Sequence, residues 1–126
     1  MLAWWLALRA GGARAQWAVD ARKARPQEGD VFVYAFGHRQ GETVRVADLV
    51  PNSEQVTCYA KDPESGVVRE GSRLNQVLVL RFDPEQLAEE TRQVSADGVV
   101  AYSAICTHTG CDISMWEEPY MLCSCH

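Results

Sequence analysis

The chain has 126 residues, of which 47% are hydrophobic and 9% aromatic. This is enough apolar material for one modest core and too little chain for two ordinary domains. The formal net charge is −5, and the sequence contains no clustered Lys/Arg face, so the composition argues against a nucleic-acid-binding protein.

The first 16 residues differ in composition from the rest. Leu2 to Leu8 form an apolar run about as long as the hydrophobic region of a signal peptide, and Ala13-Arg14-Ala15 resembles a cleavage site. We therefore expect residues 1–16 to be the remnant of an export signal or membrane anchor; the alternative is an ordinary apolar N-terminus. Residues 17–30 are charged and contain a proline and a glycine, and they are expected to form a linker.

The remainder, residues 31–126, is expected to form one domain that is mostly antiparallel β. Runs of β-branched and aromatic residues separated by turn sequences predict strands at Val31–Phe36, Thr43–Leu49, Gln55–Ala60, Gln76–Phe82 and Gly98–Ile105. A single short helix of two to three turns is expected from Asp83, because Asp83 can cap it, Pro84 suits the first helical position and Gln86 follows three residues after the cap.

The last 21 residues contain four of the five cysteines and two of the three histidines. The segments DISMW and YMLC flank the polar sequence Glu117-Glu118-Pro119, a pattern typical of a β-hairpin. A hairpin would bring Cys106 and His108 near Cys123 and His126 and create a metal site.

Two thiolates and two imidazoles could hold a tetrahedral zinc ion, so a structural zinc module is one interpretation. It does not account for Cys111 and Cys125, which lie beside the two ligand pairs, one in each loop. A hairpin would face these cysteines toward each other, and a disulfide between them would tie the loops together. Disulfides persist outside the reducing cytosol, in agreement with the signal-like N-terminus.

The motif C-x-H followed by C-x-x-H resembles the Rieske iron–sulfur domains, and CTHTGC with CSCH is similar to their disulfide-containing branch. The resemblance implies a Rieske-type antiparallel β domain with one short helix and a cluster-binding hairpin. It also implies a [2Fe–2S] cluster with Cys106 and Cys123 on one iron and His108 and His126 on the other, and a disulfide between Cys111 and Cys125. No catalytic residues are expected, because such a domain transfers electrons and carries no substrate chemistry.

The resemblance further implies an electron-transfer subunit of a membrane-associated respiratory oxidoreductase, exported to the periplasmic side of the cytoplasmic membrane. A quinol:cytochrome c reductase is favoured, with cytochrome b as the large partner subunit, cytochrome c as electron acceptor and quinol as donor. One alternative is the small subunit of a periplasmic molybdenum enzyme of the arsenite-oxidase type, beside a molybdopterin subunit. Another is the Rieske domain of an aromatic-ring oxygenase, which usually lacks the disulfide.

Further expectations concern the end of the chain, the spacer between the ligand pairs, and the residues Cys58 and His38. The chain ends at His126, where the family continues with further strands, so the Rieske domain is expected to be incomplete at its C-terminus. The 14-residue spacer between His108 and Cys123 is slightly short for the bc type and predicts a tight hairpin. Cys58 is expected to be a small buried hydrophobe and His38 a solvated turn residue.

Overall fold

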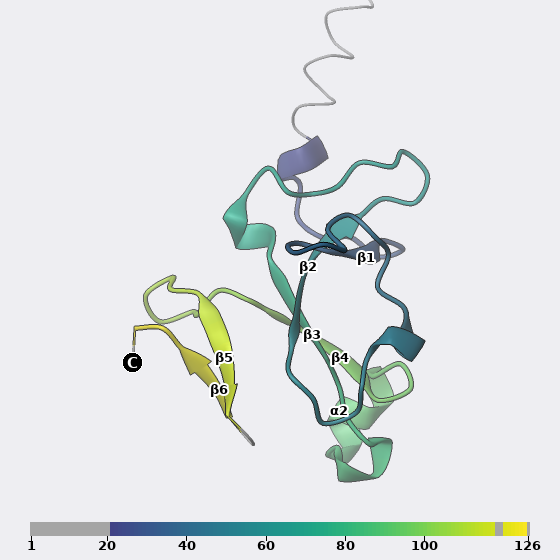
Figure 1. Cartoon of the computed structure of the whole chain (residues 1–126), viewed down its shortest axis with the longest axis vertical. Coiled ribbons are helices and arrows are strands. Elements are labelled where there is room, and N and C mark those ends of the chain that lie inside the picture. The colour runs from purple at the N-terminus through teal and green to yellow at the C-terminus, as the bar shows by residue number, and fades with distance from the viewer. Residues whose placement is uncertain (1–20, 118–119, 126) are drawn as a thin grey trace, which may run out of the picture.

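The computed structural model describes residues 21–117 and 120–125 (Figure 1). The predicted signal or anchor at residues 1–16 lies outside this range. Four strands form one antiparallel sheet in the order β1-β2-β3-β4, which is a meander because each strand pairs with the next. Their bounds are Val31–Tyr34 (β1), Val56–Lys61 (β2), Val77–Arg81 (β3) and Val99–Ser103 (β4). The mostly antiparallel β fold predicted from the sequence is confirmed.

A second, two-stranded antiparallel sheet follows β4 and stands beside the first (Figure 1). It consists of β5, Ile113–Glu117, and β6, Tyr120–Cys123. Its strands pair from Glu117 opposite Tyr120 to Ile113 opposite Cys123, with an irregularity between Ile113 and Met115. The hairpin predicted around the polar Glu-Glu-Pro sequence is therefore present, although residues 118 and 119 at its tip lie outside the described range.

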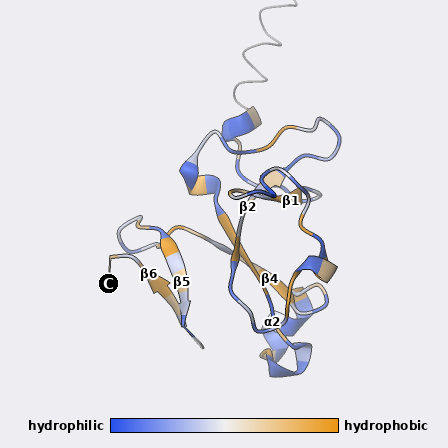
Figure 2. Ribbon diagram, in the orientation of Figure 1, coloured by the Kyte–Doolittle hydropathy of each residue, from blue (hydrophilic) through white to orange (hydrophobic). Residues whose placement is uncertain are grey.

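Strand β3 is central to the core because its side chains are buried on both faces of the sheet. Leu78 and Leu80 are 0% and 2% exposed and belong to one hydrophobic cluster, whereas Val79 is 1% exposed and belongs to another. This follows from the alternation of side chains along a strand. Figure 2 shows the hydrophobic residues concentrated in the strands, with largely hydrophilic loops around them.

The hairpin is attached to the sheet by the cluster around Leu78 and Leu80. Ile113, Trp116 and Met121 of β5 and β6 pack against this cluster, together with Phe82 at the end of β3. The rings of Phe82 and Trp116 are 5.7 Å apart between centroids and inclined by 56°, a favourable tilted arrangement. Burial of these side chains fixes where the hairpin stands on the sheet.

The strand predicted at Thr43–Leu49 is wrong. Thr43 makes a single bridge to Val33, and the chain then forms a short 3₁₀ helix, η1, at Val46–Asp48. The Asp48 carboxylate accepts a hydrogen bond from the Arg45 backbone N–H at 3.1 Å, which favours a turn over continued pairing. The turn brings Leu49 into the core, where it is 6% exposed.

The helix expected from Asp83 is split into two pieces. Pro84–Gln86 form a 3₁₀ helix, η3, capped by Asp83 as predicted, and Glu89–Val94 form α2. Leu87 interrupts the helix because its side chain packs against the core cluster. The Arg92 guanidinium donates to the carbonyls of Pro84 at 2.9 Å and Leu87 at 3.3 Å, so the interrupted backbone keeps partners.

The described part of the segment expected to be a linker, residues 21–30, makes fixed contacts with the loop before β3. Asp30 and Arg69 form an ion pair with a 2.7 Å contact, and both side chains are 6% exposed. The carbonyl of Arg22 accepts from the backbone N–H of Gly71 at 2.9 Å. Among the described residues, none of the helices is long and apolar enough to cross a membrane.

Candidate metal centre

The first loop of the candidate site runs from Cys106 to Asp112 and connects β4 to β5. It closes on itself, because the Cys106 N–H donates to the Cys111 carbonyl at 2.8 Å and the Gly110 N–H donates to the Cys106 carbonyl at 2.9 Å. Gly110 has φ +72°, a left-handed conformation that glycine adopts without steric cost. The sequence THTG thus folds as a compact turn that presents its side chains outward.

Within this loop, the sulfur of Cys106 is surrounded by hydrogen-bond donors. The backbone N–H of His108 is the strongest contributor, and the Cys123 thiol and the backbone N–H of Thr109 add to it. Together they lower the pKa of Cys106 despite partial burial, since hydrogen bonds to a sulfur favour its thiolate form. A thiolate that accepts backbone N–H bonds is well suited to bind a metal.

The second segment of the site begins at Cys123, the last residue of β6, and continues through Ser124 and Cys125. The Ser124 N–H donates to the Asp112 carbonyl at 3.1 Å, which continues the hairpin pairing beyond the strands. This register pairs Cys123 with Ile113, the first residue after the Cys106–Asp112 loop. Cys106 and Cys123 are half-buried free cysteines.

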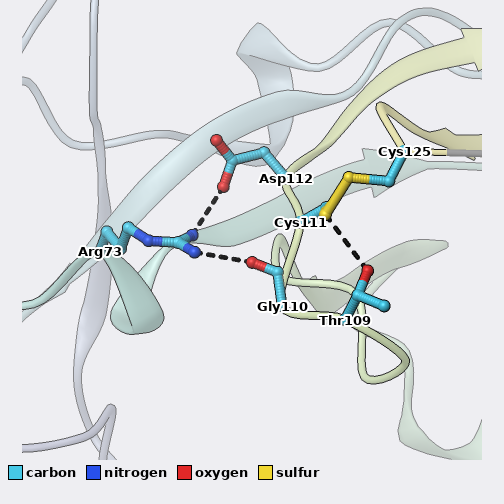
Figure 3. Close-up of a disulfide and its surroundings, with 6 residues drawn as sticks. All are labelled: Arg73, Thr109, Gly110, Cys111, Asp112 and Cys125. Carbon is cyan, nitrogen blue, oxygen red and sulfur yellow. Dashed lines mark hydrogen bonds and ion pairs between the residues drawn. A yellow bond between two sulfur atoms is a disulfide. The ribbon is translucent and has the colours of Figure 1, made fainter.

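A disulfide joins the two loops between Cys111 and Cys125, with Cα atoms 6.2 Å apart (Figure 3). The Thr109 Oγ1 lies 3.2 Å from the Cys111 sulfur. The sulfurs of Cys111, Cys123 and Cys125 lie within 4.8 Å of one another. Cys111 and Cys125 are bonded to each other, so neither is available as a thiolate ligand, whereas Cys106 and Cys123 are free thiols.

Of the four predicted ligands, Cys106 and Cys123 are free thiols in two segments joined by the disulfide, and their role as ligands stays a prediction. His108 lies in the same loop as Cys106 with an exposed side chain. His126 lies outside the described residues, and its position in the ligand set stays a prediction. Of the other cysteines, Cys58 is 0% exposed within the sheet core, as expected. Burial raises its pKa to about 12, so it is an inert thiol.

Two residues that support the site were not predicted. Arg73, in the 3₁₀ helix η2 (Arg73–Asn75) before β3, binds both Gly110 and Asp112. Gln55 donates from Nε2 to the Ser114 carbonyl in β5 at 3.0 Å. Both contacts join segments far apart in the sequence, and no local pattern around Arg73 or Gln55 indicates them.

The antiparallel β domain, its hairpin, the two half-buried thiols and the disulfide fit the class of Rieske-type domains that the sequence resembles. The comparisons with known proteins agree. The chain is 40% identical over 53 residues to the cytochrome bc1 complex Rieske iron-sulfur subunit of Streptomyces lividans, a match covering 40% of this chain and 31% of that protein.

The protein of the same description from Streptomyces coelicolor is also 40% identical over 53 residues, covering 40% of this chain and 15% of that protein. These matches confirm the resemblance to Rieske iron–sulfur proteins. The aligned region spans less than a third of either relative's length. No protein-family model matches the chain.

Proposed function

We propose that this chain transfers electrons through a [2Fe–2S] cluster as part of a quinol:cytochrome c reductase. The observation that carries the proposal is that the Cys111–Cys125 disulfide ties the loop of Cys106 to the segment of Cys123, and that both of these cysteines are free and half-buried. Its similarity to two cytochrome bc1 Rieske subunits favours this complex over the arsenite-oxidase and ring-oxygenase alternatives.

The residues of the site fit such a cluster by the chemistry of their donors. Cys106 and Cys123 would hold one iron, and His108 and His126 would hold the other. Two thiolates and two imidazoles give a one-electron carrier with a potential in the range of about −150 to +300 mV. The backbone N–H groups of His108 and Thr109 would donate to the Cys106 thiolate and hold it in place.

The disposition of the loops suits exchange of electrons with a partner. The two cysteines are half-buried against the hairpin, whereas Thr107 and His108 are exposed at the outer side of the same loop. Bound quinol or a cytochrome c would therefore approach the imidazole of His108 and not the sulfurs. A cytochrome b subunit is the membrane partner that we propose.

We also propose that the domain works outside the cytosol, on the periplasmic side of the membrane. The disulfide supports this location, because glutathione and thioredoxin keep cytosolic thiols reduced. The location can be tested by treating intact source cells with a thiol-alkylating reagent and identifying the modified peptides. Free Cys111 and Cys125 in the cellular protein would contradict the proposed location.

Metal analysis tests the proposed cluster. Anaerobic reconstitution of the chain with iron and sulfide should give equal amounts of bound iron and acid-labile sulfide, and the reduced protein should show the paramagnetic signal of a mixed-ligand cluster. Cys106→Ala and Cys123→Ala should each abolish binding, whereas Cys58→Ala should retain it as the matched control. A colourless protein that binds one zinc and no sulfide would replace the proposal with a structural zinc module.

A further inference from the structure

The guanidinium of Arg73 contacts the first ligand loop at two points on either side of the disulfide cysteine. Its Nη1 lies 2.9 Å from Oδ1 of Asp112, and its Nη2 donates to the Gly110 carbonyl at 2.7 Å. Figure 3 shows the planar group directed at both acceptors, with Cys111 between them in the chain. Arg73 belongs to η2, which leads into the central strand β3, so the contact joins the sheet to the loop.

This contact is coupled to the ligand through short backbone bonds. The Cys111 carbonyl accepts from the Cys106 N–H at 2.8 Å, and the Gly110 N–H donates to the Cys106 carbonyl at 2.9 Å. Holding Gly110 and Asp112 therefore also fixes Cys106. A planar guanidinium that binds two acceptors restricts orientation more than a single charge does.

Arg73 has an electrostatic effect as well. The Asp112 carboxylate follows directly after Cys111 and would place an unbalanced negative charge beside the centre. Reduction adds a negative charge to a cluster, so a nearby carboxylate disfavours it and a nearby guanidinium favours it. The Arg73–Asp112 pair leaves these effects close to balanced.

We propose that Arg73 is a positioning residue of the metal centre: it fixes the first ligand loop and neutralises Asp112 beside it. The electrostatic part rests on the proposed cluster, whereas the hold on the loop does not. The pair is exposed, with side-chain exposures of 56% and 61%, so the fold itself does not depend on it.

Arg22 offers a matched control for Arg73. It forms an ion pair with Glu70 at the same distance of 2.9 Å, and its side chain is also 56% exposed. This pair lies between the N-terminal segment and the loop before β3, away from the hairpin. Arg22→Gln removes an equivalent surface ion pair without touching the ligand loop.

The first measurement needs no iron. The rate at which dithiothreitol reduces the Cys111–Cys125 disulfide depends on access to its sulfurs. Cys125 is exposed, whereas Cys111 is half-buried in the loop that Arg73 contacts, so loosening this loop exposes the second sulfur to attack. Arg73→Gln should accelerate this reduction about fivefold, because an ion pair and a charge-assisted hydrogen bond are lost. Arg22→Gln should leave the rate unchanged, and Arg73→Lys should give an intermediate rate because an ammonium cannot reproduce the planar contact.

The second measurement is the midpoint potential of the iron-loaded protein. Arg73→Gln should lower the potential, Asp112→Asn should raise it, and the double variant should return close to the parent value, with Arg73→Lys also close to it. A purely structural role would not give opposite signs in the two single variants. Equal reduction rates in the parent and Arg73→Gln, or potential shifts of the same sign in both single variants, would overturn the proposal.

The two proposals fail separately. If the parent binds no iron and sulfide, the proposed function is wrong, and the reduction rates of the metal-free chain still decide whether Arg73 holds the loop. If the parent binds the cluster and Arg73→Gln loses its iron to a chelator no faster than Arg22→Gln does, the positioning role is wrong and the proposed function stands.

Discussion

Removal of the disulfide should destabilise the whole described domain and not the loops alone. The bridged cysteines are 14 residues apart in the sequence. For a ring of this size, the chain-entropy relation gives about 10 cal/mol/K of lost denatured-state entropy, or about 3 kcal/mol at room temperature. The hairpin shares Ile113, Trp116 and Met121 with the core cluster of the sheet. Opening the disulfide loop should therefore lower the unfolding free energy of the whole domain.

The assay compares urea unfolding of the oxidised parent with that of the Cys111→Ala/Cys125→Ala variant, followed by circular dichroism. The variant should lose about 3 kcal/mol of unfolding free energy, and the parent in excess dithiothreitol should lose a similar amount. Agreement between the two would exclude an effect of the alanines themselves. Identical midpoints for the oxidised parent and the double variant would refute the entropic argument and show that the hairpin unfolds independently of the sheet.

Three further predictions concern the sheet and its N-terminal segment. Gly98→Ala should lower the free energy of unfolding by about 3 kcal/mol, because φ is +82° and a Cβ would clash with the Phe82 carbonyl. Gly66→Ala, with φ +75° and open space around it, should lower it by about 1 kcal/mol, and thermal melts compare the two variants. The Cys58 thiol should resist alkylation at pH 8 until urea unfolds the chain. Because its pKa rises from 9.0 unfolded to about 12 folded, stability should fall as pH increases across that interval, and Cys58→Ala should remove this fall. The hydrogen bond from Arg69 lowers the pKa of Asp30 from 3.8, so its stabilisation is present above pH 3.8 and lost below it as the folded carboxyl protonates. Asp30→Ala should cost about 3 kcal/mol or more at pH 7, and the difference from the parent should shrink on acidification; a constant difference would contradict this account.

The strands could be predicted where the pattern was strong. The apolar run at β3 and the polar tip of the β5–β6 hairpin are local signals, and both elements form where the sequence indicates. The segment from Thr43 to Leu49 alternates like a strand. Its conformation is instead set by the burial of Leu49 and by the turn in which the Asp48 carboxylate accepts from the Arg45 N–H. Burial of Leu49 depends on tertiary packing, which the periodicity of the sequence does not predict.

In the candidate site, too, local sequence patterns predict some features and tertiary packing determines others. The spacing of the cysteines predicts that the hairpin brings its two ends together, and the disulfide between Cys111 and Cys125 confirms this. The contribution of Arg73 could not be predicted, since its partner Asp112 is 39 residues away and neither has a distinctive neighbourhood. Supporting contacts of this kind depend on how the elements pack.

The disulfide also changes the connectivity between the two thiols before any folding occurs. Cys106 and Cys123 are 17 residues apart along the chain, but the route through the bridge is five residues to Cys111 and two back from Cys125. Loop-closure entropy falls with the length of this route, so in the unfolded oxidised chain the thiols should meet about threefold more often than in the reduced chain. Oxidation alone therefore brings the two thiols together more often, before any strand has paired.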